Sequence, residues 1–270
     1  MRTIVHLSDL HFGRVDPVLP APLQAAVREL RPHVVVVSGD LTQRARRAQF
    51  AAARDFLQQL PAPRIVVPGN HDVPLYDVAR RFLAPLARFR RHIEADPAPW
   101  YADEEIAVLG INSARSLTFK GGRINREQVA LVARRFASVP QTVMRVLVTH
   151  HPFELPDRAD ASDRIGRAAM ALDAFAECGV DLLLSGHLHR VHLGGAEVIG
   201  GHGALSVHAG TATSTRGRGE ANSFNAIAVE PGRVRVVAWA WDAGRAAFVA
   251  QAPRHFVRAA GGWTERRASA

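Results

Sequence analysis

The chain has 270 residues, 47% of them hydrophobic, which is enough apolar material for one large domain with a layered core. No apolar run approaches the roughly 20 residues of a membrane helix, and residues 1–10 lack the apolar stretch of a secretory signal. We therefore expect a cytoplasmic protein without a membrane partner. Cys178 is the only cysteine, which excludes an intrachain disulfide.

The formal net charge is +9 at pH 7, from 34 Lys and Arg against 25 Asp and Glu. Lys120 is the only lysine, and the arginines are dispersed, with no run longer than two. We interpret most of this charge as a solvated basic surface rather than as a nucleic-acid interface. Such a surface would still attract an anionic substrate.

The first two thirds of the chain alternate between predicted strands and helices. Short apolar runs predict buried strands at residues 3–7, 33–37, 65–67, 106–111, 143–148 and 181–184. Amphipathic spacing predicts helices at residues 19–30, 44–60, 78–93 with an interruption at Pro85, 126–136 and 168–178. Such alternation indicates an α/β fold with a largely parallel sheet that is covered by helices.

After about residue 198 the pattern changes to strand-like runs that are separated by Gly-rich or Pro-Gly turns. The runs are VIG, ALSVHA, FNAIAVE and RVRVVAWAW, all between residues 198 and 241. We expect this part to supply a second sheet that packs on the first, within a single domain over residues 1–258. Residues 259–270 are small and polar, and we expect a flexible C-terminal tail there.

Five of the predicted strands end in a loop whose side chains can bind a metal ion. The loops contain Asp9-Leu10-His11, Gly39-Asp40, Gly69-Asn70-His71-Asp72, His150-His151 and Gly186-His187-Leu188-His189. Sites in open α/β sheets form beyond the carboxyl ends of the strands, so we expect these side chains to meet in one crevice. The motif glycines would allow tight turns and close backbone approach.

The donors are carboxylate, imidazole and amide groups without a thiolate. Such a set fits Mn²⁺, Fe²⁺ or Fe³⁺, or Zn²⁺ at a catalytic centre rather than a structural zinc site. One carboxylate can bridge two metal ions ~3.5–4 Å apart, and a water that bridges the metals becomes a hydroxide nucleophile near neutral pH. The sequence therefore predicts a dinuclear centre that hydrolyses a phosphoester bond.

The motifs DLH, GDLT, GNHD, THH and GHLH, in this order, resemble the calcineurin-like metallophosphoesterase superfamily, above all its bacterial class III cyclic-nucleotide phosphodiesterases. The resemblance covers residues 3 to about 225. It implies a four-layer α/β/β/α sandwich, the metallo-dependent phosphatase fold, with homodimers in many members. It also implies a set of site residues: Asp9, His11 and His189 for one metal, Asn70, His150 and His187 for the other, Asp40 as the bridge, and His71 beside the metals as a catalytic residue.

Departures from other branches narrow this resemblance. The sequence GDLTQR at residues 39–44 differs from the GDxVDRG of Ser/Thr protein phosphatases, and Asp72 stands where they carry Glu. Lipid A-type pyrophosphatases carry Arg at the position of His71. DNA-repair nucleases share much of the motif set but usually add a capping domain, for which this chain leaves little room.

We therefore expect a phosphodiesterase for cyclic nucleotides such as 3′,5′-cAMP or for similar small phosphodiesters. The alternatives are a DNA or RNA nuclease and a broad-specificity phosphoesterase of the same superfamily. A non-enzymatic binding module is a further alternative, against which the intact donor set argues. The sequence does not decide the oligomeric state.

Several residues near the expected ligands have open interpretations. Arg115, Arg216 and Arg218 lie in Gly-containing loops, where they would bind substrate phosphate or be ordinary exposed arginines. His151 would either support a ligand or be structural. Asp72 would orient a ligand histidine or, as we prefer, cap a helix. We expect the five arginines within residues 80–91 to form a solvated helix face.

Overall fold

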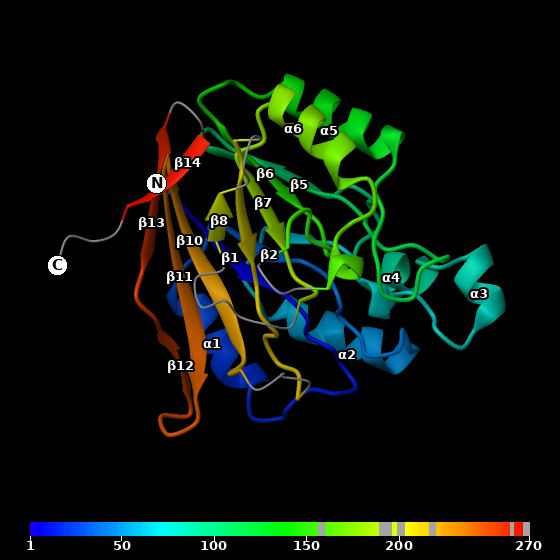
Figure 1. Cartoon of the computed structure of the whole chain (residues 1–270). Coiled ribbons are helices and arrows are strands. Elements are labelled where there is room, and N and C mark those ends of the chain that lie inside the picture. Colours follow the sequence, from blue (N-terminus) through cyan, green and yellow to red (C-terminus); the bar gives the residue numbers. More distant parts are fainter. Residues whose placement is uncertain (156–159, 189–195, 199–202, 216–219, 260–261, 267–270) are drawn as a thin grey trace.

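The computed structural model describes residues 1–155, 160–188, 196–198, 203–215, 220–259 and 262–266. Two sheets pack face to face, and helices cover the outer side of each (Figure 1). The predicted four-layer α/β/β/α sandwich is confirmed. None of the helices in the described ranges is long and apolar enough to cross a membrane.

Within the described residues, the first sheet has eight strands and joins the two ends of the chain. Its order is β14-β13-β11-β10-β1-β2-β3, and β12 pairs with β11. The N-terminal strands run parallel: β1 (Arg2–Leu7), β2 (Val34–Val37) and β3 (Arg64–Val66). The C-terminal strands pair antiparallel: β10 (Ser223–Glu230), β11 (Arg233–Asp242), β12 (Ala247–Ala250), β13 (Arg254–Ala259) and β14 (Gly262–Arg266).

The second sheet comes from the middle of the chain and has six strands in the described part, in the order β4-β5-β6-β7-β9-β8. Four of them run parallel: β5 (Ile106–Gly110), β6 (Met144–Val148), β7 (Leu182–Ser185) and β9 (Leu205–His208). The antiparallel edge strands are β4 (Trp100–Ala102) and β8 (Ala196–Val198).

The helices lie where the amphipathic pattern predicts them. On the first sheet these are α1 (Pro20–Glu29), α2 (Arg47–Gln58) and α4 (Ala87–His92), whose Phe89 is buried in the same core. The short helix α3 (Val78–Leu83) precedes α4, and the two flank the break at Pro85. On the second sheet they are α5 (Arg126–Ala137) and α6 (Ala168–Glu177). Buried Phe50 joins α2 to the first sheet, and Phe136 joins α5 to the second.

Strand β2 shows why the central strands are apolar throughout. Val34 and Val36 pack into the core between the sheets, whereas Val35 and Val37 pack against the helices. Both faces of the strand are therefore buried. Polar residues at alternate positions would have their side chains buried away from water, without hydrogen-bond partners.

Two expectations about the C-terminal part are wrong. Of the described strands of this part, only β9 joins the second sheet, beside β7, whereas β10 pairs with β1 and the later strands extend the first sheet. Residues 262–266 of the expected tail form β14, which pairs with β13. Trp263 of β14 is buried and joins Phe256 in the core between the sheets, which gives this short polar segment an apolar anchor.

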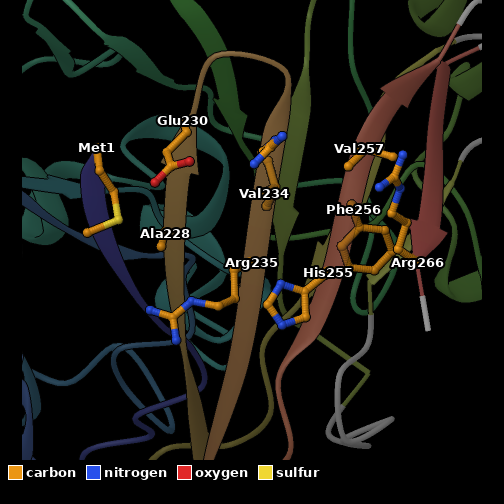
Figure 2. A pocket seen from close by; sticks show the side chains of 10 residues that line it. Met1, Ala228, Glu230, Val234, Arg235, His255, Phe256, Val257 and Arg266 are labelled. Atoms are coloured by element: carbon orange, nitrogen blue, oxygen red, sulfur yellow. The ribbon is translucent and has the colours of Figure 1, made fainter. Parts of the chain in front are cut away.

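The outer face of β10, β11 and β13 carries an open hollow (Figure 2). Its lining includes Met1, Glu230, Arg235, His255 and Arg266. Met1 precedes β1, whereas Asp9 follows the other end of that strand. A strand of this length separates the hollow from the expected metal ligands by about 20 Å.

Candidate metal centre

The expected donors meet at one edge of the sandwich, beyond the carboxyl ends of five strands. The loops after β1, β2 and β3 belong to the first sheet, and those after β6 and β7 belong to the second. In chain order these loops carry Asp9 and His11, Asp40, Asn70, His150 and His187. The site thus spans the two sheets, as the strand-end rule predicts.

Four of these residues adopt the left-handed backbone region that L-residues rarely occupy. Their φ angles are 53° at Asp9, 48° at His11, 52° at Asp40 and 73° at His187. The left-handed region is unfavourable for a non-glycine residue by roughly 1–2 kcal/mol. Such residues persist only where the surrounding structure holds them, and they cluster at functional sites.

The motif glycines allow the loops to approach one another closely. At Gly39, where φ is 94°, an added Cβ would lie 2.7 Å from His150 Nδ1. An added Cβ would collide with the Asp40 side chain at Gly69 and with Ser8 Oγ at Gly186. The predicted role of these glycines in close approach is therefore confirmed.

A first group of donor atoms consists of Asp9 Oδ1, His11 Nε2 and Asp40 Oδ2. His11 Nε2 lies 3.5 Å from Asp9 Oδ1 and 3.7 Å from Asp40 Oδ2, and all three side chains are fully buried. The other Asp9 oxygen accepts hydrogen bonds from Ser8 Oγ at 2.6 Å and from the His187 N–H at 3.0 Å. These bonds fix the carboxylate with Oδ1 toward His11.

A second group consists of Asp40 Oδ1, Asn70 Oδ1, His150 Nε2 and His187 Nδ1. His150 Nε2 lies 3.4 Å from Asp40 Oδ1, 3.2 Å from Asn70 Oδ1 and 3.3 Å from His187 Nδ1. Asp40 therefore gives one oxygen to each group. Two ligands of one tetrahedral ion, each ~2.1 Å from it, lie about 3.4 Å apart, so these separations fit metal ligands.

Hydrogen bonds to the far nitrogens fix the tautomers of both histidines in the second group. His150 Nδ1 lies 2.7 Å from the Ser38 carbonyl oxygen, which can only accept, so in the neutral ring Nε2 presents a lone pair. His187 Nε2 lies 3.3 Å from Asp163 Oδ1, so Nδ1 presents a lone pair. Lone pairs of nitrogen and oxygen thus converge, an arrangement that a cation stabilises.

Positive charge is also what the buried Asp40 carboxylate requires. Burial alone would raise the pKa of Asp40, but the nearby His150, His71 and His11 hold it well below its usual value. Burial likewise lowers the pKa of His150, yet Asp40 raises it to about 9. Asp40 Oδ2 has no hydrogen bond to any described residue, which leaves an acceptor for a cation. The residues present therefore fit a metal centre.

Asp72 braces the Asp40 loop rather than playing either expected role. Its Oδ1 accepts hydrogen bonds from the N–H and the hydroxyl of Thr42, both at 2.9 Å. Its Oδ2 accepts from the N–H groups of Gly69 at 2.9 Å and Leu41 at 3.1 Å. Asp72 thus ties the loop after β2 to the loop after β3, and it neither orients a ligand histidine nor caps a following helix.

His71 lies beside the donors, on the short 3-10 turn Asn70–Asp72. Its N–H donates to Asp40 Oδ1 at 2.9 Å, and its ring meets the His11 ring edge-on with 4.9 Å between centroids. His71 Nδ1 lies 3.0 Å from the Gln43 carbonyl oxygen and 3.3 Å from an Arg44 guanidinium nitrogen. Because the carbonyl only accepts, Nδ1 carries a proton.

His151 is close enough to His150 and His187 to complete a trio of metal-binding type. Its own nitrogens are engaged elsewhere, however. Nε2 lies 2.9 Å from the Lys120 carbonyl oxygen and Nδ1 lies 2.8 Å from Ser113 Oγ. Since the Lys120 carbonyl oxygen accepts from the Nε2–H group, the Ser113 hydroxyl donates to the lone pair of Nδ1. His151 therefore braces the loop after β5, and we do not assign it as a metal ligand.

The sequence analysis missed Asp163, which lies on the 3-10 turn Ala161–Asp163. Asp163 Oδ1 lies 3.3 Å from His187 Nε2 and 2.6 Å from Lys120 Nζ. Burial alone would raise the pKa of Asp163, but His187 and Lys120 lower it to about 2. A lone aspartate outside the five motifs gave no signal in the sequence.

Four of the predicted site residues are not among the described donors. His189, Arg216 and Arg218 lie outside the described residues. Arg115 donates to Gln128 Oε1 and to the Ala114 carbonyl oxygen, and burial lowers its pKa. Arg115 is not one of the described residues that line the pocket beside His71. Its role in substrate binding stays a prediction.

Comparison with known proteins agrees with this fold and centre. The chain matches the model of the calcineurin-like phosphoesterase family over residues 2–191. It therefore belongs to that family and is a metal-dependent phosphoester hydrolase.

The chain is 26% identical to a probable cyclic nucleotide phosphodiesterase of Synechococcus sp., over 72% of this chain and 75% of that protein. It is 25% identical to the 3′,5′-cyclic adenosine monophosphate phosphodiesterase CpdA of Escherichia coli, over 62% and 60% respectively. A dimetal phosphatase from Danio rerio has the same fold, with a TM-score of 0.65, 15% identity and coverage of 92% and 98%. The predicted resemblance to bacterial cyclic-nucleotide phosphodiesterases is confirmed.

Proposed function

We propose that this chain is a two-metal phosphodiesterase for small phosphodiesters, with cyclic nucleotides such as 3′,5′-cAMP as the favoured substrates. The observation that carries the proposal is the pair of donor groups that share Asp40. The substrate class is supported by the names of the two bacterial relatives, which align with most of the chain.

We assign Asp9 and His11 to one metal ion, together with His189. We assign Asn70, His150 and His187 to the other ion, and Asp40 to both. The mixture of oxygen and nitrogen donors fits Mn²⁺, Fe²⁺ or Fe³⁺, or Zn²⁺.

When bound, the metal ions would neutralise phosphoryl charge and lower the pKa of a water molecule at the centre. The residues of the chain prepare this site. Ser38 and Asp163 hold the rings of His150 and His187 in the tautomers that present lone pairs. The left-handed loops keep these donors in place before substrate arrives, so little reorganisation is needed.

His71 is our candidate for the group that assists the leaving oxygen. In its protonated form, Nε2 would donate a proton while Nδ1 donates to the Gln43 carbonyl. The carbonyl stabilises that charged form, whereas the neighbouring Arg44 opposes it. An anionic phosphate between His71 and the metal ions would favour the protonated form, from which the leaving oxygen would take its proton.

The test is a hydrolysis screen with Mn²⁺-loaded protein. The substrates are 3′,5′-cAMP, 2′,3′-cyclic nucleotides, glycerophosphodiesters, phosphomonoesters and single-stranded DNA. We expect metal-dependent hydrolysis of small diesters, with cyclic nucleotides ahead. Faster cleavage of DNA would instead identify a nuclease, and faster cleavage of monoesters a phosphatase. Metal-loaded protein that hydrolyses no diester would overturn the proposal.

A further inference from the structure

Phe119 is an exposed aromatic residue beside the metal centre. It lies in the loop after β5, and 68% of its surface is accessible to water. It nevertheless lines a pocket together with Asn70, His71 and Arg44. A ligand at this pocket that covers the ring would gain free energy, because removing apolar surface from water is favourable.

The backbone that carries Phe119 is tied to the centre. Three successive carbonyl groups, those of residues 118–120, accept hydrogen bonds from Arg81 at 2.7 Å, Asn70 at 3.3 Å and His151 at 2.9 Å. Asn70 is also a proposed metal ligand, and the His151 ring packs against that of His150. The position of Phe119 is therefore fixed relative to the donors.

Arg81 orients the phenyl ring. It is buried, and it also donates to the carbonyl groups of Ser116 at 2.7 Å and Pro74 at 2.9 Å. Its guanidinium carbon lies 4.6 Å from the centroid of the Phe119 ring. Arg81 thus covers one face of the ring, and the expected solvated role for this arginine is wrong. The exposed area of Phe119 belongs to the other face and the edge.

The rest of the lining places apolar surface next to positive charge. Val73 and Leu75 add apolar surface, and the Arg44 guanidinium adds positive charge next to His71. A phosphodiester of glycerol would leave the phenyl face in water. A nucleotide would cover that face with its base while its phosphate reaches His71.

We propose that Phe119 is the stacking platform for the base of a nucleotide substrate and determines the specificity of this site. The inference rests on the proposed phosphodiesterase function and deepens it. Stacking of a base on an aromatic side chain, at the magnitudes found for nucleotide-binding proteins, corresponds to about 10-fold to 100-fold in kcat/KM. That preference should appear only for substrates that carry a base.

The test compares Phe119→Ala and Phe119→Tyr with a matched control, Leu117→Ala. Leu117 lies in the same loop and is 83% exposed, but it is not one of the described residues that line the pocket. For each Mn²⁺-loaded protein, kcat/KM is measured with 3′,5′-cAMP and with base-free glycerophosphoethanolamine. Calorimetry then compares the binding of 5′-AMP with that of inorganic phosphate, and thermal unfolding and metal content check the fold.

We expect Phe119→Ala to lower kcat/KM for cAMP and the affinity for 5′-AMP by about 10-fold to 100-fold. The base-free diester and phosphate should change by less than about 3-fold, and Phe119→Tyr and Leu117→Ala should behave like the original protein. Equal loss on ligands with and without a base, or no loss on either, would overturn the platform. Inactivity of the original protein on every diester would instead refute the phosphodiesterase.

Discussion

Polar and charged side chains gather in two regions of the molecule, which differ in the burial of these side chains and in the strain of their backbone. At the metal centre, Asp9, His11 and Asp40 are fully buried and hold left-handed backbone conformations. In the hollow of Figure 2, Arg235 and His255 are exposed side chains on regular strands. The hollow is roomy, but its residues are placed there at little free-energy cost.

The difference teaches that strain and buried charge mark a site better than empty space does. Burying an ionised carboxylate is unfavourable unless a partner offsets the loss of water. Asp40 lies 3.4 Å from His150 and 3.7 Å from His11, separations that fit ligands of a shared cation, so a bound cation would offset much of the cost of burying its charge. Four predictions test this contrast.

Asp40→Asn should have the largest effect. It keeps the shape of the side chain but removes the charge that both donor groups share. We expect kcat/KM for any diester to fall by at least about 10³-fold. The metal content per chain, measured by elemental analysis, should fall as well. Two tightly bound metal ions and near-normal turnover in this variant would contradict the shared-ligand assignment.

His71→Ala should come next and should separate catalysis from metal binding. The side chain lies beside the donors, and its nitrogens are not assigned to the metal. We expect kcat to fall by about 10²-fold to 10⁴-fold while metal content stays near normal. Loss of the metal ions from this variant would show that His71 is a ligand instead.

Asp163→Asn should have a smaller effect, because Asp163 acts through His187. Removing the charge behind a metal-binding histidine lowers metal affinity by about 10-fold to 100-fold. The measurement is a titration of the apoprotein with Zn²⁺ or Mn²⁺. Lys120→Met should shift the same affinity less, since it leaves the carboxylate in place. Unchanged affinity in Asp163→Asn would remove Asp163 from the site.

Arg235→Ala should have the smallest effect and serves as the reference for the hollow. An exposed side chain of this kind changes the free energy of unfolding by at most about 0.5 kcal/mol. Hydrolysis of cAMP should stay within about 2-fold of the original rate. A large loss of activity would mean that the hollow takes part in function, and the contrast between the two regions would fail.

Much of the fold could be predicted because the patterns behind it are local. Strand β2 could be predicted from its apolar run, and the break between α3 and α4 from Pro85, because both signals lie in the local sequence. Sheet order could not be predicted, because the pairing of β1 with β10 joins residues more than 200 positions apart. Nor did the polar residues around Trp263 indicate β14, whose stability depends on distant core contacts.

The candidate site shows the same division. The donors were predicted because each belongs to a short motif at a strand end. Asp163, Arg81 and Phe119 were not, because their contacts arise only when separate loops meet. Arg81 binds backbone carbonyl groups, which every residue type offers, so no pairing of side chains could have revealed it.

The donors come from both sheets, and this has a consequence for the whole molecule. A metal ion bound by the loops after β3, β6 and β7 would link the two sheets of the sandwich. The unfolded chain does not bring these ligands together, so each bound ion would stabilise the folded state. The free energy of unfolding would then rise with the logarithm of the free ion concentration. The resistance of this protein to heat would then report on the metal supply of its surroundings.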